Sequence, residues 1–501
     1  MEYLIGLDIG TSQIKAVLFD SFGTEVVTAA HLTRINSPLV KFMEQDMEQV
    51  WHAVLYCLRS LSSQAPDAVK AAQAVGISGQ GEGLWLLDHN KQPVQSAILW
   101  NDGRSAATVA DLSQKQIQDI REITLTTPIP SSTLVQLKWM HTHRPEVLEQ
   151  AAYCIFCKDW IRFRLTGQIL CEITDISVTL MDMKKKKLAE DIFSSLGLKE
   201  HIRLFPPMYE SSSVSGHITE EAAEQTGLPF GIPVAAGALD VTATALGVKA
   251  VGENDLFLIL GTTACSGLVV SPERSSPESG KYVLHPNPDY MIKIMATMAG
   301  TPNIDWLVQS IALTDDFSHL EHALSQTHPG SGGVLYFPYI SPSGERYPFY
   351  HPHAKAGFFG ITSSTSQNHL IRAVYEGVAF SVRDCLEDET TGGRIHIAGG
   401  GSRSDSWCQI ISDCTHHEVI RFAGSEFGAK GAAILAGVCA GWYNSLDDMA
   451  SAFCHEEKWF APNPEAEDIY DDLYSLFHSI RLTYTDHWNA HQKILDVHSL
   501  R

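Results

Sequence analysis

The chain has 501 residues, more than one hydrophobic core usually serves, so two domains are expected. Its 44% hydrophobic and 19% charged residues are ordinary values for a globular enzyme. The formal net charge of −22, from 58 acidic and 36 basic residues, repels phosphate backbones and anionic membrane surfaces, so nucleic acid is not an expected partner.

The start of the chain and its cysteines predict a cytoplasmic protein. Residues 1–8 carry no basic side chain and reach an acid after a few apolar residues, which argues against a secretory signal. No run of 18 apolar residues occurs, so no membrane span is predicted. The ten cysteines lack the spacing of a disulfide framework. Cys154 and Cys157 have CxxC spacing, but no second pair completes a zinc site, and residues 153–157 predict a buried strand with no helix start to activate a thiol.

The first elements of the chain predict a meander of strands with a small polar turn. Residues 4–7 form an apolar strand that ends at Asp8, and the following turn contains Gly10 and Thr11. Residues 14–19 predict the second strand, and another turn leads into a third. The Gly-Thr turn is therefore expected at one tip of an antiparallel pair.

The same pattern returns half a chain later. Residues 256–260 predict a strand, the turn contains Gly261, Thr262 and Thr263, and residues 265–270 predict the returning strand. One Gly-Thr pair is weak evidence because turns use these residues often, but two in matching contexts indicate a duplicated domain. Helical patterns separate the strand clusters at residues 45–61, 219–227 and 366–385. Strands alternating with helices indicate an α/β fold.

The two Gly-Thr turns are candidates for holding phosphate. A phosphoryl group in transfer carries negative charge on three oxygens, so catalysis needs amides, hydroxyls and Mg²⁺ around it and a carboxylate to take the acceptor's proton. Glycine lets the backbone approach a phosphate, and threonine adds a hydroxyl donor. Asp8 is placed to hold Mg²⁺ through water, with a turn-capping role as the alternative.

Two further segments are candidates for the nucleotide site and for the catalytic base. Gly399, Gly400 and Gly401 lie between an apolar strand and a helix start, which suits phosphate or ribose contacts, although a tight strand–helix turn is equally consistent. The segment is neither a Walker loop nor a GxGxxG motif. Asp240 follows the apolar residues 232–236, where a carboxylate either caps a helix or acts as a general base.

These segments together resemble the FGGY carbohydrate kinases, a branch of the actin, Hsp70 and sugar-kinase superfamily. The matching motifs are collinear and lie at residues 8–15, 44–51, 76–80, 100–104, 158–160, 165–167, 174–177, 231–240, 261–263, 338–339, 344–348, 372–377, 399–413 and 428–433. Each motif alone is weak, but the ordered series is specific and covers nearly the whole chain.

The resemblance implies an α/β protein with two ribonuclease-H-like domains flanking a deep catalytic cleft, whose closure would exclude water. Residues 1–249 would bind the sugar and residues 250–501 would bind ATP. Asp240 would be the general base, and Asp8 would organise Mg²⁺. ATP and its phosphates would be held by Gly10, Thr11, Lys15, Gly261, Thr262, Thr263, Gly400, Gly401 and Ser404. The substrate would be bound by Gln80, Glu82, Asp102 and Asp240. Dimers are common in the family, so a homodimer is an open possibility, and no interface is indicated.

The residues after Gln80 depart from familiar members of the family. Glycerol kinases carry Arg-Glu at this strand end and xylulokinases typically carry Met-His, whereas this chain has Gly81, Glu82 and Gly83. The difference argues against glycerol and D-xylulose and looks closer to L-xylulose and erythritol kinases. Glu82 would accept hydrogen bonds from two vicinal hydroxyls, and the flanking glycines are expected to open space for four or five carbons. Gln136 stands where many members have lysine, and this change has no interpretation.

Three functions are consistent with these residues. A kinase for a ketopentose such as L-xylulose is the first expectation, and a kinase for a linear polyol such as erythritol is the alternative. A sugar-binding regulatory ATPase is the third. The acid at Asp240 favours catalysis over regulation, because a sensor has no need of a base.

Overall fold

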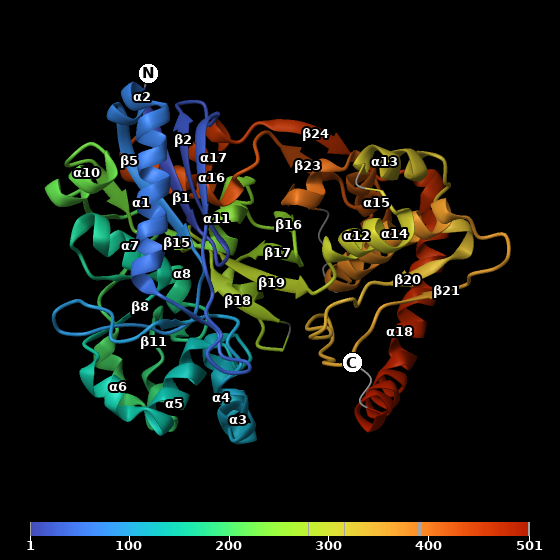
Figure 1. Cartoon of the computed structure of the whole chain (residues 1–501), viewed down its shortest axis with the longest axis horizontal. Coiled ribbons are helices and arrows are strands. Elements are labelled where there is room, and N and C mark those ends of the chain that lie inside the picture. The colour runs from blue at the N-terminus through green and yellow to red at the C-terminus, as the bar shows by residue number, and fades with distance from the viewer. Residues whose placement is uncertain (1, 279, 315, 388–392, 499–501) are drawn as a thin grey trace. The chain divides into compact units, whose positions relative to one another are not determined.

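A computed structural model describes residues 2–278, 280–314, 316–387 and 393–498 of the chain (Figure 1). The chain divides into two compact units, and neither unit is one continuous segment. The first contains residues 1–253, 269–293 and 426–455, and the second contains residues 254–268, 294–425 and 456–501. Within the described residues, no helix combines the length and the apolar character needed to cross a membrane.

The first unit is built on a seven-stranded sheet. Its strands are β1 (Tyr3–Ile9), β2 (Gln13–Asp20), β3 (Glu25–Leu32), β5 (Ala72–Gly79), β13 (Val214–His217), β14 (Pro233–Ala235) and β15 (Ala238–Leu239). Six of them lie in the order β13-β14-β5-β1-β2-β3, and β15 pairs with β5. β1 runs antiparallel to β2 and parallel to β5, and β2 runs antiparallel to β3. The structure thus contains the predicted opening meander.

Helices cover this sheet, and glycines allow one of them to approach closely. The main helices are α1 (Met47–Gln64), α4 (Gln114–Thr124), α5 (Thr133–His143), α7 (Cys157–Thr166), α8 (Ile173–Ile176), α10 (Glu220–Thr226), α11 (Asp240–Gly247), α16 (Phe427–Cys439) and α17 (Leu446–Phe453). α1 packs against β2 and β3, while α16 packs against β1, β5 and α11. A Cβ on Gly6 would lie 1.9 Å from the Ala429 carbonyl oxygen, and one on Gly76 would lie 1.7 Å from that of Ala432. Any side chain at these two strand positions would push α16 off the sheet.

The second unit repeats the arrangement of the first. Five strands lie side by side in the order β17 (Ala264–Val270), β16 (Leu256–Leu260), β22 (Ile395–Ala398), β23 (Val419–Phe422) and β24 (Glu456–Phe460). β16 runs antiparallel to β17 and parallel to β22, as β1 does to β2 and β5. The main helices are α12 (Pro302–Leu307), α13 (Phe317–Ser325), α14 (Gln367–Leu386), α15 (Asp405–Thr415) and α18 (Pro464–His498). The repeated strand arrangement confirms the predicted duplication.

One local prediction was wrong. Cys154 lies in the strand β8 (Tyr153–Ile155), as expected, but the strand ends there and α7 begins at Cys157. A helix start does therefore follow the CxxC pair, contrary to the sequence-based expectation. Both thiols are completely buried, and burial raises the pKa of Cys154 to about 12 and that of Cys157 further still, so neither is activated as a thiolate.

Candidate active site

Asp240 is the first residue of α11 and follows directly on the short strand β15. Its carboxylate accepts a hydrogen bond of 2.7 Å from the Val241 backbone N–H. Burial and the neighbouring charge of Asp8 raise the pKa of Asp240 to about 7, against a smaller opposing effect of the Val241 hydrogen bond and of Lys281. A carboxyl group with this pKa can both take and release a proton near neutral pH, which is what a general base requires.

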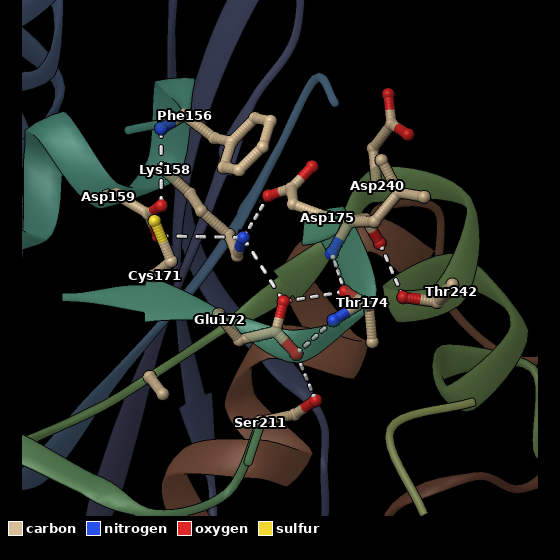
Figure 2. A network of polar contacts seen from close by, with 12 residues as sticks. Phe156, Lys158, Asp159, Cys171, Glu172, Thr174, Asp175, Ser211, Asp240 and Thr242 are labelled. Atoms are coloured by element: carbon tan, nitrogen blue, oxygen red, sulfur yellow. Dashed lines mark hydrogen bonds and ion pairs between the residues drawn. The ribbon is translucent and has the colours of Figure 1, made fainter. Parts of the chain in front are cut away.

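A fully buried polar network lies beneath Asp240 (Figure 2). Lys158 forms ion pairs with three carboxylates, those of Asp159, Glu172 and Asp175, and its bond to Asp175 is the shortest. Arg162 provides a second cation through its ion pair of 2.8 Å with Asp159. Three carboxyl groups thus face two cations, and burial raises the pKa of Asp175 while the charge of Lys158 opposes this rise.

Thr174 connects this network to the backbone that carries Asp240. Its hydroxyl donates to Glu172 Oε2 at 2.6 Å and accepts the backbone N–H of Leu239 at 2.9 Å. Glu172 is held in turn by Lys158 at 3.1 Å and by the Ser211 hydroxyl at 2.6 Å. In Figure 2 the Asp240 carboxylate points away from these groups, so the network fixes the start of α11 without occupying the base.

The segment Gly81, Glu82 and Gly83 follows β5, and its backbone is tightly enclosed. A Cβ on Gly81 would lie 2.0 Å from Leu239 Cδ1 and 2.8 Å from Asp175 Oδ1, and one on Gly83 would lie 2.4 Å from a backbone carbonyl oxygen. Glu82 itself has a φ of +54° and Gly83 one of +85°. The prediction that these glycines open space for the substrate is therefore wrong: they are required because neighbouring groups already fill the positions that side chains would take.

Glu82 is held as a buried carboxylate with unused hydrogen-bonding capacity. Its Oε1 atom is buried and has no hydrogen-bond partner among the described residues. Its Oε2 atom lies 3.8 Å from the Lys281 ammonium nitrogen. Burial raises the pKa of Glu82, and the charge of Lys281 opposes this rise. A buried acceptor without a partner suits a ligand that brings hydroxyl donors.

Gln80 and Thr11 are bound to each other and to their surroundings. The Thr11 hydroxyl donates to Gln80 Oε1 at 2.9 Å and accepts from the Trp100 indole N–H at 2.8 Å. The Gln80 amide donates to Gln45 Oε1 at 2.8 Å. These bonds use the Thr11 hydroxyl proton and the Gln80 carbonyl oxygen. In this structure the two side chains therefore connect the turn after β1 to the end of β5.

The Asp102 carboxylate is also hydrogen-bonded to other residues of the protein. Its carboxylate accepts the backbone N–H of Met43 at 2.6 Å, the backbone N–H of Arg104 at 2.8 Å, and two guanidinium N–H groups of Arg104 at 2.9 Å each. Arg104 also donates to Glu44 Oε1 at 2.7 Å. Four donors occupy the carboxylate, so its observed role is to hold Arg104 in place.

Asp8 lies at the end of β1, opposite Lys15 on β2. Its carboxylate accepts a hydrogen bond of 3.1 Å from the Ser78 hydroxyl, and among the described residues it accepts none from an N–H of the following turn, which is what a turn cap would do. Burial raises the pKa of Asp8. Lys15, expected to meet phosphate, forms an ion pair of 2.6 Å with Glu426. A Cβ on Gly428 would lie 2.7 Å from Asp8 Oδ2, so only glycine fits against this carboxylate.

The second unit contains the remaining predicted residues. Gly261 donates its N–H to the Thr263 carbonyl at 3.0 Å, and its carbonyl accepts from the Thr301 N–H at 2.7 Å. A cavity of about 550 Å³ begins near this loop and is lined by Thr301, Ile304, Asp305, Phe317, Ser318, Glu321, Tyr375, Gly400, Gly401, Arg403, Ser404 and Trp407. Ser404 caps α15 by accepting the Trp407 N–H at 3.0 Å. The cavity thus brings together the three residues predicted to hold adenosine.

Sequence reasoning missed three residues of the first unit that carry the site. Lys158 and Thr174 were noted only as parts of motifs, and Lys281 was not singled out. Several acids close to a lysine that lies in an apolar segment, as at residues 158–175, could have indicated a buried ion network. No local pattern marks Lys281, because it reaches Glu82 from a strand almost 200 residues further along the chain.

The comparisons with known proteins agree with this geometry. The N-terminal domain of the FGGY family of carbohydrate kinases matches residues 3–247, and the C-terminal domain of that family matches residues 256–440. A xylulose kinase from Bacillus subtilis is 29% identical over 98% of this chain and 98% of its own, and an erythritol kinase from Brucella abortus is 30% identical over 97% of each chain. The crystal structure of a xylulose kinase from Rhodospirillum rubrum aligns with a TM-score of 0.88 at 26% identity, covering 97% of this chain and 100% of that chain. This chain therefore belongs to the FGGY family of carbohydrate kinases, two-domain enzymes of the actin and Hsp70-like fold that use ATP to phosphorylate a sugar or polyol.

Proposed function

We propose that this kinase transfers the γ-phosphate of ATP to a hydroxyl of a ketopentose of the L-xylulose type, with Asp240 as the general base. The observation that carries the base assignment is the place of Asp240 at the start of α11, where its carboxylate points away from the buried network (Figure 2); desolvation there raises its pKa to about 7. The acceptor oxygen forms a bond to the γ-phosphorus as the bond to the bridging oxygen of ADP breaks. The acceptor's proton passes to Asp240, so the products are the sugar phosphate, ADP and one proton.

In this proposal ATP binds chiefly to residues 250–501 and the sugar chiefly to residues 1–249. The cavity of about 550 Å³ has room for the adenosine, with Gly400, Gly401 and Ser404 on its wall. The Gly261, Thr262 and Thr263 loop offers backbone N–H groups and hydroxyls to the phosphates, and the Gly10 and Thr11 turn offers its backbone, while the Thr11 hydroxyl would join only by leaving Gln80. Lys15 would join them only by leaving Glu426.

The residues around Asp8 fit a magnesium ion. Mg²⁺ prefers carboxylate oxygens and keeps several of its waters, and Asp8 offers a carboxylate that, among the described residues, accepts one hydrogen bond, from the Ser78 hydroxyl. Asp8 also raises the pKa of Asp240, so two acids lie close enough to repel each other without a cation. Bound there, the ion would neutralise charge on the transferring phosphate. Asp8 would hold it through water.

The acceptor residues support a substrate with several hydroxyls. Glu82 presents an unpartnered buried oxygen, and its neighbour Lys281 supplies a donor. Gln80 and Asp102 are proposed to act on the substrate through the residues that they hold, Thr11 and Arg104, because their own side-chain groups are engaged. A linear polyol of the erythritol type is the second candidate, since an acceptor-only Glu82 also suits a chain of hydroxyls. A regulatory ATPase is less well supported, because it gives Asp240 no role.

A substrate panel tests the proposal. Purified enzyme with ATP and Mg²⁺ is offered L-xylulose, D-xylulose, L-ribulose, erythritol, xylitol and glycerol, and ADP release is followed by a coupled assay. We expect the highest kcat/KM with a ketopentose and very low turnover of glycerol. A preference for erythritol would establish the second candidate instead. Sugar-independent ATP hydrolysis, with no phosphorylated product by NMR, would favour the regulatory ATPase.

A further inference from the structure

Lys281 is the first residue of β18 (Lys281–Leu284), in the stretch 269–293 that belongs to the first compact unit. Its ammonium nitrogen lies 3.8 Å from Glu82 Oε2, which is an ion-pair distance but too long for a hydrogen bond. The Lys281 side chain is 34% exposed, whereas that of Glu82 is 8% exposed. Lys281 therefore pairs by charge with the buried acid, and since its ammonium donates no hydrogen bond to any described residue, its N–H donors are available for a ligand.

Two carboxyl groups of the proposed acceptor site interact electrostatically with Lys281. Glu82 and Asp240 both offer carboxylate oxygens, and both feel the positive charge of Lys281. Hydroxyl groups of a sugar can donate to these oxygens, but a carbonyl oxygen can only accept. Two carboxylates alone would repel the carbonyl of an open-chain ketose and would favour a fully reduced polyol. Of the side chains just named around the acceptor site, only Lys281 stays a hydrogen-bond donor whatever the protonation state of the two carboxyl groups.

We propose that Lys281 is a specificity-determining residue that donates a hydrogen bond to the carbonyl oxygen of an open-chain ketose, while Glu82 accepts from a neighbouring hydroxyl. The inference rests on the proposed function, because it concerns the acceptor of the same reaction. A polyol places a hydroxyl where the ketose has its carbonyl, and a hydroxyl can turn its proton toward Glu82. Lys281 therefore sets the preference for ketose over polyol.

The test compares one ketose with its reduced counterpart in three enzymes. Wild type, Lys281→Met and Lys281→Arg are assayed with L-xylulose and with xylitol, which differ only at the carbonyl carbon. Xylitol is measured as a substrate and also as a competitive inhibitor, so weak turnover does not prevent the comparison. Thermal melting of each variant establishes that it is folded.

We expect Lys281→Met to lose about tenfold to hundredfold in kcat/KM for L-xylulose, the usual worth of a hydrogen bond from a charged donor. Xylitol should change less than threefold, and Lys281→Arg, which keeps a cationic donor, should recover most of the ketose preference. An equal loss for both acceptors, or no loss for either, would overturn the inference. An equal loss together with a shifted acidic limb of the pH profile would assign Lys281 to tuning Asp240 instead, which also overturns it.

Failure of the proposed function looks different. A wild-type enzyme that phosphorylates no ketose and no polyol, or one that prefers xylitol to L-xylulose, would contradict the proposed substrate class before any variant is compared. A ketose-preferring wild type whose Lys281→Met variant keeps the same preference would contradict only the role of Lys281.

Discussion

The Thr174 hydroxyl is the group through which the buried ion network reaches the backbone beside Asp240, the proposed base, and replacing Thr174 with valine removes this hydroxyl with almost no change in shape. The valine leaves the Leu239 N–H without its acceptor at 2.9 Å and removes the hydroxyl donor at 2.6 Å from Glu172 Oε2, which keeps its ion pair with Lys158. An unsatisfied buried donor costs about 1–3 kcal/mol, and a hydrogen bond to a charged group is worth about 1.5–3 kcal/mol. Because Leu239 immediately precedes Asp240, part of this loss appears as a displaced base.

The expected result is a fall in kcat of about tenfold to hundredfold with a small change in KM for the sugar, because a misplaced catalytic group affects the transition state more than substrate binding. Thr174→Ser is the matched control, since it keeps the hydroxyl and loses only a methyl group. Coupled ADP release at saturating ATP gives both constants for the two variants. Equal kcat values for the valine and serine variants would refute the idea that this hydrogen bond positions Asp240.

Three further predictions follow from the geometry of the site. The value of kcat/KM should rise with pH around pH 7, as Asp240 loses its proton. A kcat/KM that is constant from about pH 5.5 to 8 would contradict the assignment of Asp240 as the base. Burial raises the pKa of Asp240 in the folded state, so its ionisation costs stability as pH rises from about 4 through 7. Asp240→Asn should therefore raise the melting temperature at pH 8 and lose this advantage toward pH 4. A melting-temperature difference that stays the same across this range would show that Asp240 is not the titrating group. Gly81→Ala should lower kcat about tenfold or more, since its methyl would lie 2.0 Å from Leu239 Cδ1, whereas alanine at the uncrowded Gly357, outside the proposed site, should leave sugar kinetics intact.

The repeat and the candidate base could be identified from the sequence, because both depend on local patterns. The strand–turn–strand segments at Asp8 and Gly261 are each encoded by a short run of residues, and both are present in the structure. Asp240 could be singled out because an acid after an apolar strand is unusual. Helix starts were less visible: α7 begins at Cys157, immediately after a strand of three residues.

The contacts of the site could not be predicted, because they join residues far apart in the chain. Gln80 and Asp102 were expected to bind sugar, and the sequence could not reveal that Thr11 and Arg104 occupy their hydrogen-bonding groups. The glycines beside Glu82 suggested open space, whereas Leu239 and Asp175 fill it. The assignments of individual residues to ATP, Mg²⁺ and sugar stay predictions.

The most direct test of the central claim is the rate of sugar phosphorylation by wild-type and Asp240→Asn enzyme, with ³¹P NMR to identify the product. Asparagine keeps the size of the side chain and cannot take the acceptor's proton at neutral pH. We predict that wild type converts a ketopentose to its phosphate with stoichiometric ADP, and that the variant loses at least about a thousandfold in kcat while still binding the sugar. Turnover of the ketopentose by Asp240→Asn at a rate close to that of wild type would contradict the account.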